Sequence, residues 1–142
     1  MEPSDVRRRV RQAIDQARKR SAARRAAADR AAREYESFIP NVATPVFRLF
    51  ASVVKAEGYP FAVFTPAGGL RLASERSAED FIELALDAGL DPPAVVGRVN
   101  RGRGSRIITD ERPVREGAAV QALTEDDVLE FLLREIVPLL ER

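Results

Sequence analysis

The residues most suggestive of binding chemistry are four arginines that surround two glycines. They lie within nine residues of the segment GRVNRGRGSR, at Arg98, Arg101, Arg103 and Arg106. Gly102 and Gly104 can adopt the positive φ that a tight turn requires, and arginines on both sides of a hairpin can converge on one anion. The pattern predicts an anion-binding hairpin tip. Exposed arginines at such a tip also keep a sheet edge soluble, and this alternative needs no ligand.

Enzymatic chemistry has few candidate residues, because the chain contains no histidine and no cysteine. This excludes the commonest general base, thiolate nucleophiles, disulfides, and metal sites built on either residue. Carboxylates remain in two clusters, Glu79, Asp80, Glu83 and Asp87 in one and Glu125, Asp126 and Asp127 in the other. Paired acids can transfer protons or hold Mg²⁺, which leaves open a carboxylate-dependent enzyme acting on a phosphorylated substrate. The clusters also suit a solvated strand face and the start of a helix, so we predict no catalytic residue, no metal and no cofactor.

The first 38 residues predict one long basic helix. Residues 4–38 contain neither glycine nor proline and are rich in alanine and arginine, both strong helix formers. Residues 1–35 hold eleven Lys or Arg against five acids, whereas residues 36–142 hold twelve against seventeen. At 1.5 Å per residue the helix would run roughly 50 Å and overhang a domain whose radius of gyration is near 13 Å.

A seam of apolar and small residues follows this helix at alternating spacings of four and three. The members predicted to mediate oligomerisation are Val10, Ile14, Ala17, Ala28, Ala31, Tyr35 and Phe38. This spacing is typical of a helix that packs lengthwise on another helix. Polar Ser21 and Arg24 interrupt the seam, which favours a dimer of modest stability. The many arginines also suit contact with nucleic-acid phosphates.

The elements after this helix alternate between helix and strand signals. TPVFRLFASVVKAEGY is typical of a second helix, with Thr44 as the N-cap, Pro45 at the first helical position and Gly58 as the C-cap. PFAVFTPAGGLRLAS predicts a hairpin, and PAVVGRVN and SRIITDER predict two strands joined by the arginine turn. Residues 77–89 fit either a capped helix or an alternating strand, and we favour the strand.

The last segment, LTEDDVLEFLLREIVPLLER, predicts a helix with a capping box formed by Thr124 and Asp127. Its apolar residues cover more than one stripe, so it should pack against the sheet or a partner. The fold class is therefore α+β. We expect a long N-terminal helix, a second helix, an antiparallel meander sheet of four to five strands, and a C-terminal helix packed on the sheet. Two parts are expected, the helix 1–38 and a compact domain 39–142.

These features favour a non-enzymatic binding or assembly module, a homodimer that self-associates through its N-terminal helix. The main alternative is a protein that binds nucleic acid or another polyanion through the basic helix and the arginine hairpin. An acidic protein would also fit these cations. The sequence shows no secretory signal and no run of about 18 apolar residues, so we expect no membrane span and a cytoplasmic protein.

Overall fold

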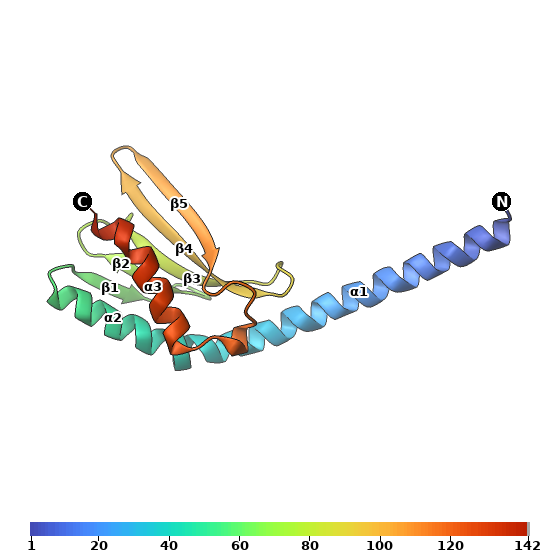
Figure 1. Cartoon of the computed structure of the whole chain (residues 1–142), viewed down its shortest axis with the longest axis horizontal. Coiled ribbons are helices and arrows are strands. Elements are labelled where there is room, and N and C mark those ends of the chain that lie inside the picture. Colours follow the sequence, from blue (N-terminus) through green and yellow to red (C-terminus); the bar gives the residue numbers. More distant parts are fainter. Residues whose placement is uncertain (142) are drawn as a thin grey trace.

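The structure is a computed structural model that describes residues 1–141, a long helix attached to a layered domain (Figure 1). The helices are α1 (Pro3–Phe38), α2 (Thr44–Ala56) and α3 (Glu125–Leu140), with a π-helical turn at Ile39–Ala43 and a 3₁₀ turn at Val120–Ala122. The strands are β1 (Phe61–Phe64), β2 (Leu70–Ser74), β3 (Phe81–Asp87), β4 (Ala94–Arg103) and β5 (Arg106–Pro113). All neighbouring strands pair antiparallel in the order β1-β2-β3-β4-β5. The predicted α+β class and the meander sheet are confirmed.

The helices α1 and α2 run into each other, and the prediction of Thr44 as an N-cap is wrong. The Thr44 N–H donates to the Ile39 carbonyl five residues earlier, the spacing of a π-helical turn. The Thr44 hydroxyl donates to the same carbonyl at 2.7 Å. Pro40 and Pro45 have no N–H to donate, and the wider turn carries the helix past them. The sequence signal failed because proline is compatible with a helix start and also with a π-helical turn.

Helix α2 ends as predicted at Gly58, which has a φ of +99°. The Gly58 N–H donates to the Lys55 carbonyl at 3.0 Å, and the Tyr59 N–H donates to the Val54 carbonyl at 2.9 Å. These two bonds form the Schellman motif that a left-handed residue allows after a helix. The chain then turns back into β1.

The sheet is covered by helices on one face only, as Figure 1 shows for α2 and α3. Residues 77–89, for which helix and strand were both open, contain strand β3, with Ile82 and Leu84 completely buried and Glu83 between them only half-buried. The side chains that fill the core include Phe47, Leu70, Leu72, Ile82, Leu84, Phe131 and Leu132. The other face of the sheet remains open to solvent, which explains the alternation along β3.

Helix α3 is fixed to the sheet by packing and by ion pairs. Thr124 and Asp127 form the predicted capping box, with bonds of 3.2 Å and 2.9 Å between each side chain and the other's N–H. The Phe131 ring lies against Gly97 of β4 so closely that a Cβ there would overlap it. Arg112 of β5 binds Glu135 of α3 through two hydrogen bonds. Helix α3 is thus capped at its start and held against β4 and β5 along its length.

Candidate functional site

The part of α1 that extends beyond the domain is the most prominent surface feature of the molecule (Figure 1). Every residue from Pro3 to Arg20 is exposed, and the first buried residue of the helix is Ala31. We call residues 3–23 the arm. It is about 30 Å long and carries seven Lys or Arg against two acids, a net charge of +5.

The structure divides the predicted oligomerisation seam between the domain and the arm. Ala31, Tyr35 and Phe38 are buried in the core of their own chain, and Ala28 is half-buried where α1 leaves the domain. Val10, Ile14 and Ala17 are exposed on the arm. The half of the seam that remains free for a partner is therefore the N-terminal half.

One apolar residue of the arm, Val6, is not part of the predicted seam. Val6, Val10 and Ile14 are 40%, 50% and 45% exposed and follow one another at a spacing of four. Side chains at this spacing lie on one face of a helix. We call these three residues the arm row. Sequence reasoning missed Val6 because the alternating four-three spacing places Arg7 in the seam, whereas a strict four-residue repeat would have found it.

Helix α3 carries a second exposed row with the same spacing. Leu129, Leu133 and Val137 are 38%, 53% and 48% exposed. We call these three residues the α3 ridge. The exposed acids Asp126 and Glu130 lie beside the ridge on the helix surface. The sequence already indicated this exposed row, because the apolar residues of the helix cover more than one stripe and cannot all face the sheet.

The structure places Arg101, Arg103 and Arg106 on one face of the sheet and Arg98 on the other. Gly97 faces α3, so the alternation of a strand places Arg101 and Arg103 on that face and Arg98 on the open face. The Arg103 Nη2 donates to the Pro138 carbonyl at 3.1 Å, where a helix C-terminus favours a cation. Arg106 opposes Arg103 in the register and is exposed.

Arg98 belongs to a row of alternating charges across the open face of the sheet. The register pairs Arg71 with Glu83, Glu83 with Arg98, and Arg98 with Glu111. Arg71 Nη2 lies 3.1 Å from Glu83 Oε1, and Arg98 Nη2 lies 3.6 Å from Glu111 Oε2. Opposite charges on neighbouring strands stabilise a sheet. At least two hairpin arginines, Arg98 and Arg103, thus have partners within the chain.

The carboxylate clusters also have structural partners. The buried Asp80 accepts a hydrogen bond from the Gly102 N–H at 2.9 Å. The Thr124 N–H and hydroxyl, with Arg115, hold the pKa of Asp127 below its usual value. Across residues 1–141, no three acidic side chains gather as a metal site would require. The first cluster joins strands and the second caps a helix.

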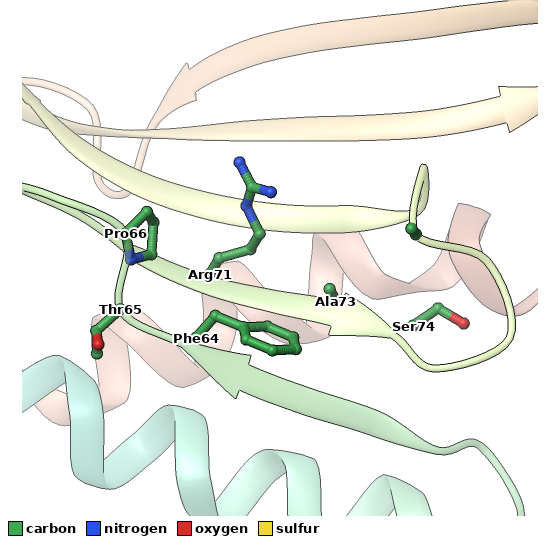
Figure 2. A pocket seen from close by; sticks show the side chains of 7 residues that line it. Phe64, Thr65, Pro66, Arg71, Ala73 and Ser74 are labelled. Atoms are coloured by element: carbon green, nitrogen blue, oxygen red, sulfur yellow. The ribbon is translucent and has the colours of Figure 1, made fainter.

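A cavity of about 510 Å³ lies on the open face beside the edge strand β1 (Figure 2). It is lined by Phe64, Thr65, Pro66, Arg71, Ala73, Ser74 and Ala78. The Arg71 guanidinium is bound to Glu83 and lies 4.1 Å above the Phe81 ring. This lining can accept an apolar group, and it offers no pair of groups suited to acid–base chemistry.

Tyr35 is a phenol with a strongly shifted pKa. Burial, and secondly the charge of Glu83, raise the pKa of Tyr35 to about 12. Its hydroxyl donates to the Gly68 carbonyl at 2.7 Å. Tyr35 therefore joins α1 to the β1–β2 turn as a neutral phenol.

By length and composition alone, the continuous helix Pro3–Ala56 could cross a membrane, with a mean hydropathy of 1.3 over 18 residues. Core helices of water-soluble proteins pass the same test, so this is weak support for a membrane span.

Comparison with known proteins gave no match: no family model, no curated protein and no solved structure is significantly similar to this chain.

Proposed function

We propose that the protein is a non-enzymatic assembly module that self-associates through its N-terminal helix. The observation that carries this proposal is the arm row, three apolar side chains about 40 to 50% exposed on a segment in which every residue from Pro3 to Arg20 is exposed. Isolated helices depend on tertiary packing for much of their stability. A partner that covers the arm row would supply that packing.

The test compares two substitutions of the same kind on opposite faces of the arm. Ile14 lies in the arm row, and Gln12 faces away from it. We expect light scattering at tens of micromolar to give a mass above the 15.7 kDa of one chain. Ile14→Glu should return the mass to 15.7 kDa, and Gln12→Glu should leave the larger mass unchanged. A monomeric wild type, or equal masses for both variants, would refute the proposal.

Binding of nucleic acid is the second candidate function. It is favoured by the exposed basic residues of the arm, which cover the faces that the arm row leaves free. Each phosphate contact should contribute a slope of about −0.9 to the dependence of log affinity on log salt for duplex DNA. Replacing Arg8, Arg11 and Arg18 by Gln should reduce both affinity and slope. Binding that is equal in wild type and variant would eliminate this function for the arm.

A further inference from the structure

We infer that the arm row of one copy docks on the α3 ridge of a second copy. This inference rests on the proposed self-association and names the surface that receives the arm. Both rows consist of three apolar residues at a spacing of four, and both are exposed in the single chain. Rows at this spacing are the ridges that interdigitate when helices pack, and each row here spans about 12 Å.

The arm does not reach the ridge of its own chain. Helix α1 continues into the core, where Ala31, Tyr35 and Phe38 are buried and fix its direction. Figure 1 shows the arm leading away from α3. A second copy must therefore supply the ridge.

The charges of the two surfaces are complementary. The arm carries a net charge of +5. Of the five acids of α3, Glu135 and Asp127 are already paired with Arg112 and Arg115. The acids that face the incoming arm are Asp126 and Glu130, which are exposed beside the ridge. Docking the arm on α3 places arginines such as Arg7 and Arg11 near these carboxylates. Complementary charges of this kind accelerate encounter and fix orientation more than they increase affinity.

Pairing of two arms is disfavoured by the same charges. Arg11, Arg18 and Arg25 recur every seven residues beside the seam. In a two-stranded coiled coil, the positions beside the seam face each other across the interface. The positions on both sides of the arm seam carry no acid, so no opposite charge offsets the arginines when two arms pair. The α3 ridge offers apolar contact without this repulsion.

The proposed contact joins two different surfaces, the arm row of one copy and the α3 ridge of another. Each copy can therefore take part in two contacts at once, one through its arm and one through its ridge. Such a head-to-tail contact forms a ring when the rotation closes and an open chain when it does not. Assembly limited to a dimer of paired arms would instead use one surface twice.

Disulfide trapping can test this contact cleanly, because the chain contains no cysteine. Ile14→Cys and Leu133→Cys proteins are mixed in equal amounts and oxidised with oxidised glutathione. We expect the main product to be the mixed dimer, in which position 14 of one copy is cross-linked to position 133 of the other. A mixture of Gln12→Cys with Leu133→Cys is the control, and it should give at least fivefold less mixed dimer because Gln12 faces away from the arm row.

A second measurement keeps the inference separate from the proposed function. We expect Leu133→Gln to weaken self-association at least tenfold, while Ile107→Gln, at another exposed apolar residue, leaves it unchanged. Association should also weaken between 0.05 and 0.5 M salt, since added salt screens opposite charges. Predominant cross-links between position 14 of both copies, with no effect of Leu133→Gln, would overturn the inference and leave self-association standing. A wild-type chain that is monomeric throughout would overturn both.

Discussion

Arg112 of β5 and Glu135 of α3 form a two-point ion pair, with Nε to Oε1 at 2.7 Å and Nη2 to Oε2 at 2.9 Å. The Glu135 side chain is 6% exposed, while that of Arg112 is 48% exposed. The hydrogen bond to Glu135 raises the pKa of Arg112 above its ordinary value. The pair therefore fastens the last strand to the C-terminal helix from one side of the core.

Arg112→Ala should lower the free energy of unfolding by about 1–3 kcal/mol, because it leaves the Glu135 carboxylate without this charged donor. Arg98→Ala is the control, since its partner Glu111 is 44% exposed whereas Glu135 is buried, and exposed pairs contribute about 0.2–1 kcal/mol. Urea denaturation measures both. Equal losses in the two variants would contradict the structural role of the Arg112–Glu135 pair.

Gly97→Ala should destabilise the chain by about 1–3 kcal/mol, because the added methyl group overlaps the Phe131 ring. The double variant Gly97→Ala with Phe131→Leu removes the clash at the cost of core volume. The double variant should therefore lose less free energy of unfolding than the two single variants lose together. Thermal or urea unfolding measures the free energy of all three variants. If the losses of the single variants add up exactly in the double variant, Gly97 and Phe131 are not in contact.

The capping box makes stability depend on pH in the acid range. Bonds from Thr124 hold the pKa of Asp127 below its usual value, which is about 3.9 in an unfolded chain. The stabilisation is present above that value and is lost as the pH falls through the lower folded pKa. Asp127→Asn should thus be less stable than wild type at pH 7, with the difference shrinking below about pH 4. A constant difference in urea titrations from pH 7 to pH 2 would contradict this prediction.

Tyr35 makes stability depend on pH in the alkaline range. Its pKa is raised to about 12 in the folded chain, against about 10 when unfolded. The folded state keeps the proton longer, so the free energy of unfolding should fall as pH rises between these values, by up to about 1.4 kcal/mol per unit. Tyr35→Phe should remove this component, and Tyr59→Phe should retain it. Identical slopes in the two variants would exclude Tyr35 as the cause.

The local signals of the sequence predicted most of the fold. Alternating apolar residues indicated the strands, and Thr124, Asp127 and Gly58 marked helix ends that the structure confirms. The continuity of α1 with α2 was not predictable, because Pro40 and Pro45 are compatible both with a break and with a π-helical turn.

The candidate site was less predictable than the fold. The sequence grouped four arginines in one hairpin. In the structure, Arg98 binds Glu111 on one face of the sheet, and Arg103 binds the end of α3 on the other face. Periodicity identified the seam of α1 but not where the domain begins to cover it, between the half-buried Ala28 and the buried Ala31. Which part of the seam is free for a partner depends on long-range packing, which spacing along the chain does not encode.

The most direct measurement is the mass of the full chain by sedimentation equilibrium across concentration. Self-association through the arm predicts a weight-average mass that rises above 15.7 kDa with concentration. Ile14→Glu should hold the mass at one chain under the same conditions, with Gln12→Glu behaving as wild type. A wild-type mass that stays at 15.7 kDa up to hundreds of micromolar would contradict self-association through the arm.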